Sequence, residues 1–167
     1  VEGGRIDWAC HANDAAAAVR DVLALDLAVR AAQDFCRDRP GRCLVVVTAD
    51  HETGGLKVAD PGRVGLLAGQ DRSGEAFERG VMGPFFETCE QEGCGFSAMR
   101  PLAAGHFGLD WGKGASGPLA LSGPQVHGLE KAFSLSRRFR DSRVGRKVAF
   151  LGYGGRDPVS THLCALL

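Results

Sequence analysis

The chain has 167 residues, a length that allows one domain with a sizeable hydrophobic core. It carries 20 basic and 20 acidic residues, so no net electrostatic field favours nucleic acid or an anionic membrane surface as a partner. No segment approaches the roughly 18 to 20 continuous apolar residues that span a bilayer, so we expect no membrane span.

Residues 1–13 read VEGGRIDWACHAN and hold the first candidate ligands. Asp7 and His11 are four residues apart, so one helical turn or a compact loop would direct both side chains to a common point. Glu2 adds a third oxygen ligand nearby. From residue types alone, solvated carboxylates and a surface histidine are the alternative to a metal site.

A helix is predicted from residue 14 to about residue 38, because this stretch lacks Gly and Pro and is dominated by Ala. Asn13 or Asp14 can cap its first turn. Apolar residues spaced by three and four form a stripe suited to packing on a sheet: Val22, Leu25, Val29, Ala32 and Phe35. Pro40-Gly41 ends the helix.

Residues 44–55 read LVVVTADHETGG and follow the helix at once. The run of Leu44 and three Val is typical of a strand buried on both faces, in a parallel sheet covered by helices. Ligands of such sheets bind beyond the carboxyl ends of the strands, where Asp50 and His51 lie. A carboxylate and an imidazole there both suit zinc. We therefore predict an α/β fold with a central, mostly parallel sheet and a metal site at its edge.

The rest of the chain predicts helices between glycine-rich loops. Ser73 is expected to start a helix that Pro84 kinks or breaks. A short helix is expected over residues 97–106. Ser122 and Gln125 form a capping box for a longer helix. The inner face of that helix holds Val126, Leu129, Phe133 and Ser136.

The last quarter of the chain begins with an arginine-rich stretch over residues 137–146. We interpret it as a solvated helix end in preference to a phosphate or nucleic-acid patch. Residues 148–153 predict a short strand or the approach to a turn. Asp157 and Pro158 are the expected N-cap and first position of a final helix.

The cysteines include no C-x-x-C pair, so a thiolate zinc site is not expected. Two pairs flank short turns, Cys36 with Cys43 and Cys89 with Cys94. Local disulfides and reduced, half-buried thiols are both compatible with this spacing.

The stretch VEGGRIDWACHANDA, followed about forty residues later by LVVVTADHETGGL, resembles the alkaline phosphatases nearly throughout. The later pieces FGLDWGKG, ALSGPQVHGLEKAFSLS and YGGRDPVSTHL also resemble the bacterial members. The resemblance is weakest over residues 57–94. It implies a three-layer α/β/α sandwich, with residues 1–167 as part of one alkaline phosphatase-like domain truncated at both ends.

The family uses two Zn²⁺ ions and one Mg²⁺ ion, and the resemblance assigns ligands position by position. Glu2 resembles the magnesium ligand. Asp7 and His11 resemble two ligands of the first zinc, and Asp50 and His51 resemble ligands of the second. Trp8 takes a position that lines the active site in the family.

The activity implied is hydrolysis of phosphate monoesters through a phosphoseryl intermediate. Two zinc ions about 4 Å apart clamp the attacking and leaving oxygens of an in-line phosphoryl transfer. The resemblance also implies a homodimer in the periplasm or outside the cell, although no signal peptide is seen in this stretch.

Several parts of the family pattern are missing from this sequence. The nucleophilic serine lies in an Asp-Ser-Ala type motif upstream of the matched residues, so no catalytic nucleophile is expected here. A His-Thr-Gly motif supplies the third ligand of the first zinc, and His162 does not match it. His106 and His127 are expected to be structural or surface residues. We therefore expect this segment alone to be inactive.

Two alternatives remain beside an alkaline phosphatase. One is another enzyme of the same metal-dependent superfamily, such as a phosphodiesterase, sulfatase or phosphomutase. The other is a non-catalytic, truncated fragment that binds metal without turnover.

Overall fold

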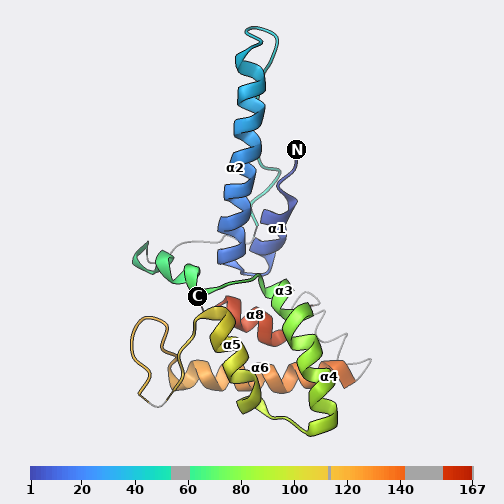
Figure 1. Cartoon of the computed structure of the whole chain (residues 1–167), viewed down its shortest axis with the longest axis vertical. Coiled ribbons are helices and arrows are strands. Elements are labelled where there is room, and N and C mark those ends of the chain that lie inside the picture. The colour runs from blue at the N-terminus through green and yellow to red at the C-terminus, as the bar shows by residue number, and fades with distance from the viewer. Residues whose placement is uncertain (54–60, 113, 142–155, 167) are drawn as a thin grey trace.

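The structure is a computed structural model that describes residues 1–53, 61–112, 114–141 and 156–166. Within these residues the elements are α1 (Gly4–His11), α2 (Ala15–Arg37), the 3₁₀ helix η1 (Pro61–Gly69), α3 (Gly74–Phe77), the π-helical turn η2 (Glu78–Met82), α4 (Gly83–Glu92), α5 (Phe96–Phe107), α6 (Gly123–Asp141) and α8 (Pro158–Cys164). The long helix α2 projects from a bundle of the later helices, and α1 lies beside its base (Figure 1).

The predicted α/β sandwich with a central parallel sheet is wrong for the described residues. They contain no strand, and only one isolated bridge, between Asp110 and Ala120. Leu44 and Val46 remain 85% and 72% exposed, because no neighbouring strand pairs with this run. A strand needs a partner for its N–H and C=O groups. The other predicted strand, over residues 148–153, lies outside the described residues.

The helix predicted after residue 14 is confirmed as α2. Asp14 is its N-cap, and the Asp14 side chain accepts a hydrogen bond from Ala17 N at 3.0 Å. Small residues let α1 approach α2 closely, and the buried ones are Ala9, Ala12, Ala16 and Ala18. The apolar stripe farther along α2 has no sheet to cover it, so Val22 and Phe35 stay exposed.

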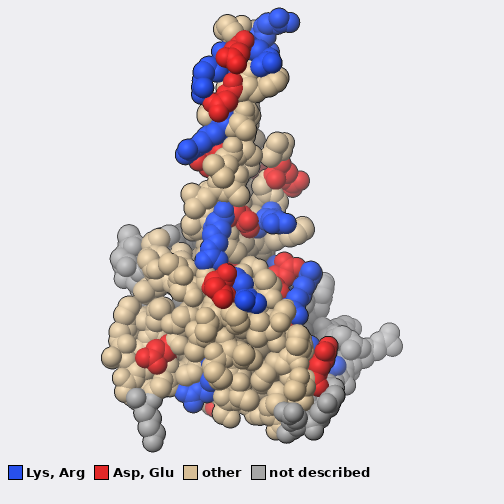
Figure 2. Space-filling model, viewed as in Figure 1, with Lys and Arg blue, Asp and Glu red and all other residues tan. Residues whose placement is uncertain are grey.

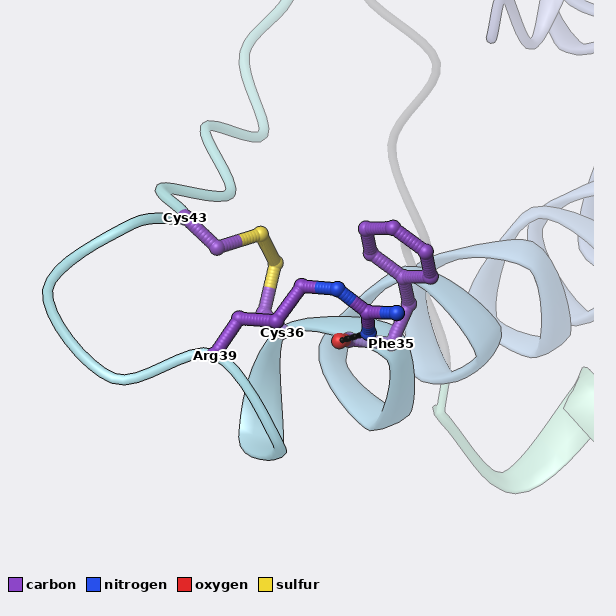
Figure 3. The surroundings of a disulfide bond; sticks show 4 residues. All are labelled: Phe35, Cys36, Arg39 and Cys43. Carbon is purple, nitrogen blue, oxygen red and sulfur yellow. Dashed lines mark hydrogen bonds between the residues drawn. A yellow bond between two sulfur atoms is a disulfide. The ribbon is translucent and has the colours of Figure 1, made fainter.

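Both cysteine pairs form disulfides in the structure, Cys36 with Cys43 and Cys89 with Cys94. The first closes the turn after α2, where the Arg39 guanidinium lies 3.7 Å from the centre of the Phe35 ring (Figure 3). Arg39 also donates a hydrogen bond of 2.5 Å to the Phe35 carbonyl, so this turn is held by three kinds of contact. Cys10 and Cys164 are free thiols.

The helical bundle below α2 contains the main core. Its buried apolar side chains come from α3, η2, α4, α5, α6 and α8 and include Phe77, Met82, Phe86, Met99, Phe107, Leu129, Phe133, Val159 and Leu163. Many rings meet edge to face, as Phe77 does with Phe107 at 5.1 Å between centroids. No helix of the described residues is long and apolar enough to cross a membrane.

The predicted helix starts in the bundle are confirmed by their caps. Ser73 accepts a hydrogen bond from Ala76 N at 3.2 Å and begins α3. The chain then widens into the π turn η2, so the irregularity precedes Pro84, which lies in the first turn of α4. The Ser122 N–H donates to Gln125 Oε1 at 2.8 Å at the start of α6.

The final helix, α8, is held by a buried carboxylate. Asp157 Oδ1 accepts hydrogen bonds from Val159 N at 2.9 Å, Ser160 N at 3.3 Å and Ser136 Oγ at 3.0 Å. Ser136 lies on the predicted inner face of α6, of which Leu129, Phe133 and Ser136 are buried and Val126 is half-buried. The cap therefore joins α8 to α6.

Candidate metal centre

Helix α1 positions the first two predicted ligands on one side. Asp7 and His11 are separated by one helical turn, and Asp7 Oδ1 lies 3.3 Å from His11 Nε2. The helix starts at Gly4, after Gly3, whose carbonyl accepts a hydrogen bond from Ile6 N at 2.9 Å. The helical backbone of α1 therefore places Asp7 and His11 side by side, as their spacing of four residues predicted.

The segment after the Cys36–Cys43 disulfide brings two further candidate ligands to α1. It descends along α2 toward α1 (Figure 1). His51 Nε2 then lies 3.8 Å from Asp7 Oδ1, and the His11 and His51 rings are 6.2 Å apart between centroids. Asp50 Oδ2 lies 3.7 Å from His51 Nε2. Four of the five residues predicted as ligands thus share one neighbourhood.

Asp7 Oδ1 is the centre of this cluster and is itself unsatisfied. The atom is buried and has no hydrogen-bond partner among the described residues, although the two imidazole nitrogens face it. A buried carboxylate oxygen without a partner is costly, because it has lost water without gaining a donor. An oxygen in this position is suited to accept a cation.

His51 is oriented by its own loop. Its Nδ1 lies 2.7 Å from the carbonyl oxygen of Glu52. That hydrogen bond, followed by the nearby Asp50 carboxylate, raises the pKa of His51 above its ordinary value. In the neutral ring, an Nδ1–H that donates to Glu52 O leaves Nε2 free to bind a metal.

Glu2 and Trp8 do not join the cluster. The Glu2 carboxylate lies over the backbone of Gly4, where an added Cβ would be 3.4 Å from Glu2 Oε1. The Trp8 side chain is 62% exposed, and its carbonyl accepts a hydrogen bond from Arg156 at 3.2 Å. Nothing in this arrangement brings either side chain to Asp7.

The remaining histidines lie away from Asp7. His106 Nδ1 is 2.9 Å from Asp71 Oδ2 and lowers the pKa of that carboxyl through the hydrogen bond. His127 is exposed on α6, and the His162 ring packs against Gly128.

The donors at Asp7 fit zinc by type, since they are carboxylate oxygens and imidazole nitrogens. The 3.3 Å between Asp7 Oδ1 and His11 Nε2 also matches two donors sharing one ion with bonds of about 2.0–2.1 Å. The described residues nevertheless contain no group of three or more His, Cys, Asp or Glu side chains arranged to hold a metal. They provide adjacent pairs of donors and no full coordination shell.

Comparison with known proteins covers this same part of the chain. The family model described as Alkaline phosphatase matches residues 1–78. Over those residues the chain is similar to the alkaline phosphatases. The match includes every candidate ligand of the cluster and ends just after α3. It leaves most of the helical bundle without a family match.

Individual alkaline phosphatases give the same result over short stretches. The repressible alkaline phosphatase of Saccharomyces cerevisiae is 50% identical over 56 residues, which is 34% of this chain and 10% of that protein. Alkaline phosphatase 4 of Bacillus subtilis is 42% identical over 62 residues, or 37% of this chain and 13% of that protein. The matched part therefore spans only about a tenth of the length of these relatives. No solved structure matches the chain.

Proposed function

We propose that the chain is part of a metal-dependent phosphate monoester hydrolase of the alkaline phosphatase type. The observation that carries the proposal is the convergence of His11 and His51 on the unsatisfied Asp7 Oδ1, within the residues that match the family. Asp7 and His11 would hold one Zn²⁺, Asp50 and His51 a second, and Glu2 a Mg²⁺.

Bound zinc would act as a Lewis acid on the oxygens of a phosphate monoester. The residues of this chain would bind the zinc ions and fix their positions. Asp7 and His11 would do so from a rigid helix, while the hydrogen bond to Glu52 O would hold the His51 ring with Nε2 toward Asp7. The nucleophilic serine lies outside these 167 residues in this proposal. A homodimer in the periplasm or outside the cell belongs to the same proposal, and the two disulfides favour such an oxidising compartment.

Metal binding tests the proposal directly. The full chain, purified with a chelator and dialysed, would be titrated with Zn²⁺ by isothermal titration calorimetry. We expect Asp7→Asn and His51→Asn each to weaken zinc binding by at least about tenfold, because the first removes the carboxylate charge and the second removes the imidazole nitrogen. Asp26→Asn is the matched control, since Asp26 lies on α2 in an exposed ion pair with Arg30. Zinc affinity that is the same in both ligand variants and the control would overturn the proposal.

Turnover is the second measurement. We expect the 167-residue chain to release no p-nitrophenol from p-nitrophenyl phosphate. Zinc-dependent release that disappears in Asp50→Asn would contradict this expectation. Faster hydrolysis of a sulfate ester or a phosphodiester by a longer form of the protein would favour another enzyme of the superfamily.

A further inference from the structure

A second polar site lies between α1, α2, α3 and Arg156, which precedes the N-cap of α8. It is a pocket of about 440 Å³, a size typical of small-ligand sites. Four arginines from different elements line it, namely Arg5, Arg20, Arg79 and Arg156. Figure 2 shows basic and acidic side chains interleaved where the projecting helix joins the bundle.

The pocket lies on a different face of α1 from the candidate metal centre. Arg5, Ala9 and Ala12 line it at spacings of four and three residues. At about 100° per residue, this stripe is turned by roughly 150° from the one that carries Asp7 and His11. Trp8 lies between the two stripes and forms part of the pocket wall.

Most acidic groups of the pocket already have partners. Glu75 is paired with Arg79 at 2.8 Å. Asp14 is buried, and its carboxylate accepts hydrogen bonds from Ala17 N, Gln70 Nε2 and Gly74 N. Asp21 is the one lining carboxylate without a hydrogen bond or ion pair among the described residues.

The basic groups are less fully used. Arg20 donates to the Gln70 carbonyl and Arg156 to the Trp8 carbonyl, so among the described residues each guanidinium uses only one of its five N–H donors. Arg5 makes no hydrogen bond or ion pair with any described residue. Among the described residues that line the pocket, three incompletely used guanidinium groups therefore outnumber one unpaired carboxylate, so the pocket carries a net positive charge.

We propose that this pocket binds a small phosphate-bearing anion without the help of a metal ion. The planar guanidinium fork matches phosphate oxygens in pairs, and Arg5, Arg20 and Arg156 line the pocket from three different parts of the chain. The exposed Trp8 indole at the rim offers a face on which an aromatic group attached to the phosphate can stack. This inference does not depend on the proposed hydrolase activity.

Isothermal titration calorimetry of the full chain in excess chelator tests the proposal, with inorganic phosphate and phenylphosphonate as probes. Phenylphosphonate is chosen because its carbon–phosphorus bond resists hydrolysis. We expect saturable binding of both. Arg5→Gln and Arg156→Gln should each weaken it by about tenfold or more, since each removes a charged donor. Arg30→Gln, on the exposed flank of α2, should leave it unchanged.

A Trp8→Ala variant separates the two forms of the ligand. If the aromatic group contributes, phenylphosphonate binds more tightly than phosphate in the parent chain, and this preference disappears in Trp8→Ala. Equal affinity of both probes in the parent assigns the pocket to phosphate itself. Circular dichroism of each variant confirms that α1 and α2 remain folded.

The outcomes also separate this pocket from the metal centre. Binding that persists in chelator and in Asp7→Asn supports the pocket. Phosphate binding that requires added zinc and vanishes with chelator overturns the pocket and leaves the metal centre standing. Arg5→Gln and Arg156→Gln variants that bind like the parent overturn the pocket as well.

Discussion

The backbone N–H of Gly74 donates a hydrogen bond of 2.7 Å to Oδ2 of Asp14, which lies sixty residues earlier in the chain. The same carboxylate caps α2 through Ala17 N and accepts from the Gln70 side chain at 2.8 Å. One buried aspartate therefore fixes the start of α2 against the start of α3, and the projecting part of the molecule against the bundle.

Replacing this aspartate should destabilise the chain strongly. Asp14→Ala removes an N-cap and leaves the buried Gly74 N–H and one of the two N–H bonds of the Gln70 amide without an acceptor, so we expect a loss of about 2–4 kcal/mol in the free energy of unfolding. Urea denaturation followed by circular dichroism measures it. Asp26→Ala, which removes only an exposed i, i+4 ion pair on the same helix, should cost about 0.5 kcal/mol. Equal losses in the two variants would contradict the role of Asp14.

Two C-capping glycines should respond differently to alanine. Gly93 and Gly108 both have a positive φ, so either substitution incurs backbone strain of about 1–2 kcal/mol. A Cβ at Gly108 would also lie 3.2 Å from Gly69 Cα, whereas a Cβ at Gly93 meets nothing within 4 Å. We therefore expect Gly108→Ala to lower the midpoint of urea unfolding more than Gly93→Ala. The reverse order would show that η1 and α5 are not packed as described.

Stability should fall as the pH rises above about 4 because of two neighbouring acidic groups, the buried Asp157 and the half-buried Glu78. Burial raises the pKa of Asp157 and of Glu78, whose Oε2 accepts from Asp157 N at 3.1 Å. The folded chain then binds more protons than the unfolded chain above the ordinary carboxyl pKa. The protonated forms of Asp157 and Glu78 therefore stabilise the fold at low pH, and this stabilisation is lost as the pH rises through the raised pKa values of the two groups.

Urea denaturation at several pH values between 4 and 7, in the presence of chelator, measures this effect. Glu78→Gln removes one of the two titrating groups, so we expect a shallower decline of the unfolding free energy with pH. The pKa of Asp71 is lowered, so its protonation changes stability only below pH 4 and does not contribute to the decline measured here. An unchanged pH dependence in Glu78→Gln would contradict the assignment.

The two free thiols should differ sharply in reactivity. Cys164 is 4% exposed, and burial raises the pKa of its thiol, which suppresses the reactive thiolate. Cys10 is only half-buried on α1. We expect iodoacetamide at pH 8 to label Cys10 in the native chain and Cys164 only after addition of denaturant, as followed by mass spectrometry. The same digest, without reductant, should contain the Cys36–Cys43 and Cys89–Cys94 peptides. Similar labelling rates for both thiols would show that Cys164 is not enclosed.

The sequence predicted the helix starts well because their causes are local. Asp14, Ser73 and Asp157 each cap a helix within three residues of themselves, and the spacing of Leu129 and Phe133 identifies a buried face. The prediction of a strand over Leu44–Val47 was wrong, because strand pairing depends on a neighbouring segment that a local pattern does not reveal.

Only part of the candidate metal centre could be predicted from local sequence patterns. The i, i+4 spacing of Asp7 and His11 is local, but the approach of His51 to Asp7 depends on the path of the chain after α2. The arginine pocket was missed altogether. Arg5 and Trp8 share a helical face, yet no sequence signal relates them to Arg79 or Arg156.

The projection of α2 from the bundle implies two levels of stability within one chain. Its first turns are tied to α1 and α3, whereas Leu23, Leu27 and Phe35 farther along remain exposed. Amide hydrogens in the distal half should therefore exchange with solvent through local opening, much faster than those of α6. The Cys36–Cys43 bridge limits how far that end can fray without joining it to the core. A calorimetric scan would accordingly report the melting of the bundle. Hydrogen exchange rates along α2 would report a separate, lower free energy of local opening.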